Sequence, residues 1–71
     1  MIQELHTPNG VYTVHPIHRK PRVLDDPSTG VYDLVSYQVF KPNGQLDCFV
    51  TLRVKRGFEA RIQDIANMAG L

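Results

Sequence analysis

Apolar and polar residues alternate along the segment that follows the Asn43-Gly44 dipeptide. Every second residue from position 46 to position 54 is apolar, and the residues between them are mostly polar or charged. A period of two over this length predicts a β-strand with one buried face. The buried row is predicted to comprise Leu46, Cys48, Val50, Leu52 and Val54.

Residues 31–40, with the sequence VYDLVSYQVF, predict the partner strand because they are rich in β-branched and aromatic side chains. Asn-Gly readily adopts the positive φ angles of tight turns, so Asn43-Gly44 is predicted to join the two strands as an antiparallel hairpin. A two-residue or four-residue turn would set apolar residues opposite apolar ones, whereas a three-residue turn with a bulge would shift the pairing by one residue. The first arrangement, which we favour, pairs Val39 with Cys48, Tyr37 with Val50 and Val35 with Leu52. The second pairs Phe40 with Leu46 and Leu34 with Leu52.

A second Pro-Asn-Gly sequence, at residues 8–10, predicts an N-terminal hairpin in which residues 2–6 pair with residues 11–17. The next segment, residues 18–30 with the sequence HRKPRVLDDPSTG, contains two prolines, a glycine and two adjacent aspartates. This composition predicts a loop between the two hairpins.

The spacing of apolar residues changes after Gly57. Apolar residues then recur at three- and four-residue intervals among charged and amide side chains, which predicts an amphipathic helix of about three turns. Glu59 suits the positive end of the helix dipole, and Gly70 can supply the C-terminal cap. The predicted apolar stripe consists of Phe58, Ile62, Ile65, Ala66 and Ala69.

Together these elements predict one α+β domain that spans residues 1–71. It has a small antiparallel sheet of three to four strands, with the hairpin turning at Asn43-Gly44, packed against one C-terminal amphipathic α-helix. The helix is expected to cover the Val50, Leu52 and Val54 row of the last strand. A chain of 71 residues has room for one hydrophobic core.

The composition is that of an ordinary globular domain, with 42% hydrophobic residues and a formal net charge of +1. Cys48 is the only cysteine, which excludes an intrachain disulfide and fits a reducing compartment. The N-terminal residues lack the basic stretch and long apolar run of a secretory signal, and no apolar run approaches the roughly 20 residues that span a membrane. We therefore expect a cytoplasmic protein without membrane contact.

The histidines and the cysteine carry the donor atoms that zinc prefers, and His15 and His18 are close in sequence. His6 and Cys48 are further candidate ligands. However, residues three apart in an extended strand point to opposite faces, and structural zinc sites usually use closer, cysteine-rich pairs. We therefore expect exposed histidines, no metal site and no cofactor.

No motif in the sequence identifies a catalytic chemistry. Cys48 falls in the predicted buried row, where a free thiol behaves as a small apolar group. Asp25 and Asp26 lie beside a proline, in a loop where aspartate commonly bonds turn amides. Asp33 shares the parity of the buried row, and its place near the open end of the hairpin should let it reach water or Arg56. We expect these acids to be structural and the protein not to be an enzyme.

The second face of the predicted sheet is unusually apolar for a surface meant only for water. Its large side chains are Tyr32, Leu34, Phe40 and Phe49, which are the residues we expect to bind a partner. One helix cannot cover both faces of a sheet. The N-terminal hairpin, a second copy of the chain or a different protein could each cover this one.

Basic residues form two clusters that could contact phosphate. One lies in the first loop with His15 and His18, and the other ends the last strand. The six cations are Arg19, Lys20, Arg22, Arg53, Lys55 and Arg56.

Three functions remain open. The first is a non-enzymatic regulatory or inhibitory module that acts through protein–protein contact, in one version as a homodimer. The second is a nucleic-acid-binding domain that uses the two basic clusters, since some DNA-binding modules of similar plan lay three strands in the major groove. The third is an accessory or metal-binding protein built around its histidines.

Overall fold

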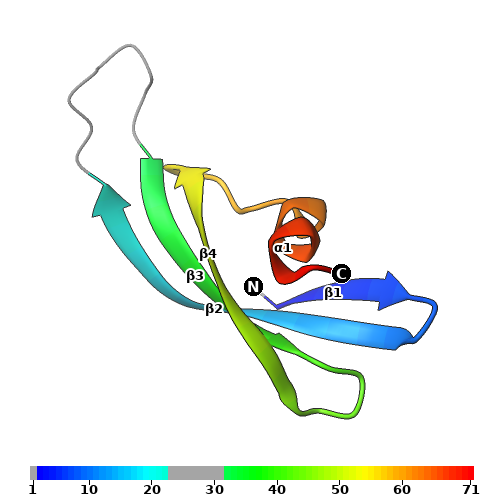
Figure 1. Ribbon diagram of the computed structural model, residues 1–71. Helices are drawn as coiled ribbons and strands as arrows, with labels where there is room; N and C mark the ends of the chain where they lie inside the picture. The colour runs from blue at the N-terminus through cyan, green and yellow to red at the C-terminus, as the bar shows by residue number, and fades with distance from the viewer. Residues whose placement is uncertain (1, 23–31) are drawn as a thin grey trace.

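The computed structural model describes residues 2–22 and 32–71, which form an antiparallel sheet and one helix (Figure 1). The elements are β1 (Gln3–Thr7), β2 (Gly10–Arg22), β3 (Tyr32–Phe40), β4 (Leu46–Lys55) and α1 (Ile62–Ala69). The strands are hydrogen-bonded in the order β1-β2-β3-β4. Helix α1 packs against β4 and β1 on one side of the sheet, which we call the inner face. The predicted small α+β fold is therefore confirmed.

The β3–β4 hairpin combines the two registers that the sequence allowed. Gly44, at φ 89°, donates to the carbonyl of Lys41 at 2.9 Å, and Lys41 donates to the carbonyl of Gln45 at 2.8 Å. The turn is thus the three-residue form, and the favoured two-residue form is wrong. A bulge at Asp47 then restores the expected pairing further along the strands. The observed pairs are Phe40 with Leu46, followed by Val39 with Cys48, Tyr37 with Val50 and Val35 with Leu52.

The N-terminal hairpin is also present. Thr7 pairs with Gly10 around the Pro8-Asn9 turn, and the Thr7 hydroxyl donates to the Gly10 carbonyl at 2.7 Å. Gly10 has a φ of 125°, and a Cβ at this position would lie 2.8 Å from the side chain of Pro42. The two hairpin turns therefore meet, and only glycine leaves room for that contact.

Strand β2 is longer than the sequence indicated. Residues 18–22, predicted as loop, pair with residues 32–36 of β3. Pro21 in this stretch is tolerated because β1 pairs only with residues 10–14, so the other edge of β2 is open beyond that point. Asp25 and Asp26, predicted as turn-forming acids, lie outside the described residues.

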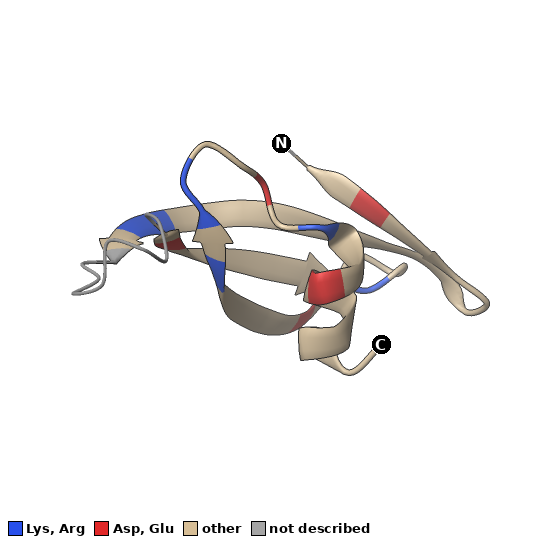
Figure 2. Cartoon of the chain, turned by 90° about the horizontal axis from the view of Figure 1, so that it is seen from above, with Lys and Arg blue, Asp and Glu red and all other residues tan. Residues whose placement is uncertain are grey.

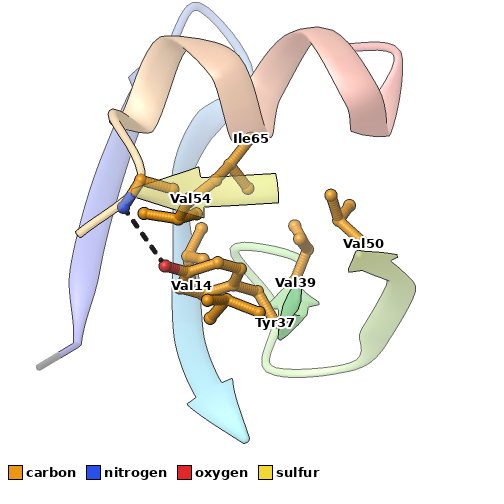
Figure 3. Packing of buried hydrophobic residues seen from close by; sticks show 8 residues of the cluster. Val14, Tyr37, Val39, Val50, Val54 and Ile65 are labelled. Atoms are coloured by element: carbon orange, nitrogen blue, oxygen red, sulfur yellow. Dashed lines mark hydrogen bonds between the residues drawn. The ribbon is translucent and has the colours of Figure 1, made fainter. Parts of the chain in front are cut away.

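Helix α1 is shorter than predicted. It begins at Ile62 and ends at Ala69, so Phe58 lies outside it and is 60% exposed. The buried Tyr37 hydroxyl accepts the Ala60 N–H at 3.3 Å, which holds the preceding segment against the sheet (Figure 3). The predicted C-terminal cap is confirmed, because Gly70 is left-handed at φ 76° and its N–H reaches the last turn.

The hydrophobic core lies between α1 and the inner face. Tyr37 and Val39 have no exposed surface, and Ile65 points from the helix into the cluster (Figure 3). The other members are Val14, Val35, Val50, Val54 and Ala60. Leu46, predicted in this row, is instead 44% exposed because the bulge changes its parity. No helix in the described part of the chain has the length and apolarity to cross a membrane.

Candidate functional site

The sheet has a second face, opposite the helix, which we call the outer face. Helix α1 packs on the inner face and β1 extends the sheet sideways, so neither element covers the outer face (Figure 1). The N-terminal hairpin, one of the three expected covers, therefore does not bury it. By strand register, the outer face comprises Thr13, His15, His18, Lys20, Tyr32, Leu34, Ser36, Gln38, Phe40, Leu46, Phe49, Thr51, Arg53 and Lys55.

The four apolar residues expected to bind a partner all lie on the outer face. Phe49 is 60% exposed, whereas Tyr32, Leu34 and Phe40 are half-buried. The rings of Phe40 and His15 pack in a T-shaped arrangement, with 4.9 Å between their centroids. Phe49 is thus the aromatic ring of this set that is most available to a ligand.

The six predicted cations do not act as one group, because the structure divides them between the two faces. Arg19 and Arg56 lie on the inner side and flank the buried carboxylate of Asp33. Arg19 Nη1 lies 2.7 Å from Asp33 Oδ2, and Arg56 Nη2 lies 3.0 Å from Asp33 Oδ1. The expected contact between Asp33 and Arg56 is confirmed, and Arg19 is an additional partner.

These contacts have a clear electrostatic result. The hydrogen bond from Arg19 is the main cause that holds the pKa of Asp33 below its usual value, despite burial, and Arg56 adds to it. The same bond raises the pKa of Arg19. Arg19 also donates to the Phe58 carbonyl at 2.9 Å. Both arginines therefore have a structural role.

Lys20, Arg53 and Lys55 lie on the outer face instead. Lys20 and Arg53 both pair with Leu34, from opposite sides, and Lys55 pairs with Tyr32. Figure 2 shows the basic residues of β2 and β4 gathered at the same end of the sheet. Among the described residues, no carboxylate forms an ion pair with any of these three cations. Arg22, the sixth predicted cation, pairs with Tyr32 through its backbone.

Two of these outer cations rest on aromatic rings. The guanidinium carbon of Arg53 lies 5.2 Å from the centroid of the Tyr32 ring, and Lys55 Nζ lies 5.6 Å from that of Phe58. Cation–π contacts of this kind restrict a long side chain without neutralising its charge. The positive charge is therefore held near the sheet while staying open to solvent.

His15 and His18 do not point to opposite faces, as expected for residues three apart in a strand, because a bulge lies between them at Ile17. The register shift between Pro16 and His18 places His15 opposite Gln38 and His18 opposite Ser36, so both histidines are on the outer face. In residues 2–22 and 32–71, no group of three His, Cys, Asp or Glu side chains gathers to hold a metal. The histidines instead belong to a polar strip with Gln38, Ser36 and Thr51, in which the two hydroxyls lie 2.9 Å apart.

Cys48 and Asp33 are poorly placed to act as catalytic groups. Cys48 is half-buried on the inner side, and burial, with a smaller effect from Asp47, raises the pKa of its thiol. A raised pKa makes a weaker nucleophile at neutral pH. An open cavity of about 600 Å³ lies beside Asp33, Arg56 and Phe58. Both oxygens of its aspartate already accept hydrogen bonds from arginine.

Charge and polarity change along the outer face from one end to the other. The cations lie at the end where Tyr32 and Leu34 are found, hydrogen-bonding side chains occupy the middle, and Phe40 and Leu46 lie at the far end. Glu4, which reaches this face through its pairing with Thr13, is also at the far end. The face therefore offers a ligand one cationic end, a polar centre and an exposed ring.

No protein-family model, curated protein or solved structure matches this chain.

Proposed function

We propose that this protein is a non-enzymatic nucleic-acid-binding module that uses the outer face of its sheet. One observation carries the proposal: strand register places Lys20, Arg53 and Lys55 at one end of one face, whereas the neighbouring Arg19 and Arg56 are held by Asp33. A cluster of unneutralised cations on one surface attracts the phosphate backbone, even in a protein whose net charge is only +1.

The centre of the outer face supports the same function. Gln38, Ser36 and Thr51 can each donate and accept hydrogen bonds, and so can a neutral histidine. Such groups are suited to base edges, which present both donors and acceptors. The proposal places the protein in the cytoplasm, where its single cysteine would stay reduced.

The test is the salt dependence of binding. The double variant Arg53→Gln with Lys55→Gln should lower the slope of log affinity against log salt by about 1.5, because each phosphate contact contributes roughly 0.7 to 0.9. Fluorescence anisotropy with a labelled oligonucleotide gives this slope. The matched control is Arg61→Gln; the Arg61 side chain is 83% exposed and pairs with Asp64 of α1. Absence of binding at low salt, or an affinity that does not change with salt concentration, would contradict the proposal.

A second candidate function is favoured by the apolar part of the same face. Phe49 is 60% exposed and Leu46 is 44% exposed, which is more apolar surface than a phosphate ligand requires. A regulatory module that binds a protein, or a second copy of itself, would use these two residues together with Tyr32, Leu34 and Phe40. The two candidate functions can be distinguished experimentally, because self-association occurs without nucleic acid.

A further inference from the structure

We propose that the nucleic acid bound by the outer face is single-stranded, with its backbone at Lys20, Arg53 and Lys55 and a base stacked on Phe49. The inference rests on the proposed function and names the ligand class of that site. It is carried by two features of the face: its cations lie at one end only, and its most exposed aromatic ring lies nearer the other end.

Because the cations lie at one end of the outer face, they are better placed to contact one phosphate backbone than the two backbones of a duplex. A sheet that enters the major groove of a duplex, about 12 Å wide, lies between two backbones and meets phosphates on both sides. On this face, the end opposite the cations carries Phe40 and Leu46, with Glu4 beside them on β1. A second backbone there would meet apolar groups and a carboxylate. A single strand has only one backbone, so it requires cations on one side only.

Phe49 is placed to stack on a base. It is 60% exposed and lies on the same strand and face as Arg53, four residues away, which corresponds to about 13 Å along a β-strand. Thr51 lies between them on the same face. Unpaired bases commonly stack on exposed aromatic rings while cations hold the backbone. The base-paired interior of a duplex offers no free base to this ring.

The polar strip gives the unpaired bases hydrogen-bonding partners. His15 and Gln38 lie in the row of Phe49, and His18, Ser36 and Thr51 lie in the next row toward the cations. A strand that runs from Arg53 to Phe49 would pass over both rows. Its bases could then use edges that are paired in a duplex.

The experiment compares one labelled oligonucleotide of about 12 nucleotides, a length within known single-strand site sizes, with the duplex made from it. Both DNA and RNA strands are measured by fluorescence anisotropy at the same low salt. We expect the single strand to bind at least about tenfold more tightly. Phe49→Ala should weaken single-strand binding by about tenfold, the loss of one stacked base, whereas Phe49→Tyr should retain it. The control Met68→Ala replaces a residue of α1 with the same 60% exposure and should bind as the wild type does.

The outcomes separate this inference from the proposed function. Equal or tighter binding to the duplex, or unchanged binding by Phe49→Ala, overturns the single-strand inference and leaves nucleic-acid binding standing. Absence of binding to either form at low salt overturns both. Because Phe49 is exposed, the variants should melt at the wild-type temperature, and thermal melting checks that they remain folded.

Discussion

At the scale of single residues, neighbours in sequence have different roles because strand parity assigns them to opposite faces. Arg19 contacts Asp33 on the inner side, whereas Lys20 lies on the outer face. Composition and clustering group the two residues together, and this is why the sequence predicted both of them in the first of two basic clusters. The contacts with Asp33 give Arg19 and Arg56 a structural role, and the role in ligand binding that we propose falls to the outer residues.

The buried carboxylate of Asp33 leads to a prediction about acid stability. Its pKa is lowered in the folded state, so the unfolded chain binds a proton more readily. The stability that it contributes is complete above the ordinary aspartate pKa of about 3.9 and is lost as pH falls through the lowered value. Urea unfolding between neutral pH and about pH 2.5 should therefore show the midpoint falling at the acidic end.

Asp33→Asn provides the control for that prediction. The variant should be less stable than the wild type at neutral pH, because the two arginines lose their anion. The difference between the two proteins should shrink in acid, where the wild-type carboxylate is also neutral. A difference that stays constant across this range would show that Asp33 does not titrate as the structure indicates.

At the scale of elements, the sequence predicted each strand and the helix but not all of their limits. Strict alternation gave β4, and the Asn-Gly turns gave both hairpins. Residues 18–22 carry charges and a proline, so nothing local marks them as a strand. They are held by pairing with β3, a long-range contact. The bulges at Ile17 and Asp47 carry no local signal either, and they decide which residues face outward.

The start of the helix gives a second prediction. Phe58 and Ile65 appear equivalent in the apolar spacing, but Phe58 is 60% exposed and Ile65 is 1% exposed. Ile65→Ala should lower the free energy of unfolding by about 2 to 5 kcal/mol, because it leaves a cavity in the core. Phe58→Ala should change it by no more than about 0.5 kcal/mol. Urea denaturation measures both, and similar losses would show that Phe58 packs as a helix residue.

At the scale of the whole molecule, the net charge is near zero, but the cations are distributed unevenly between the two faces of the sheet. The paired cations lie on the inner side, whereas strand register places the unneutralised ones at one end of the outer face. The apolar content of the outer face was predictable from the sequence, because parity alone places Tyr32, Leu34 and Phe49 opposite the core row. The division of charge was not, because it depends on the extension of β2.

The protein–protein function is tested on the whole molecule by sedimentation. If the outer face forms a homodimer, the sedimentation coefficient should rise with protein concentration in the absence of nucleic acid. Phe49→Asp should then return the protein to a monomer without lowering its melting temperature, because the core lies on the other face. A monomer at every concentration would remove the homodimer version.

The bulge at Ile17 inserts one unpaired residue into β2 and so exchanges the faces to which the odd- and even-numbered residues after it belong. Before it, even-numbered residues such as Val14 face the helix; after it, odd-numbered residues such as Arg19 do. Without this extra residue, the same downstream sequence would turn its faces over: the guanidinium that neutralises Asp33 would point outward, and the ammonium of Lys20 would be directed inward. One residue without a partner in the ladder thus keeps the charges needed by the fold separate from those offered to a ligand.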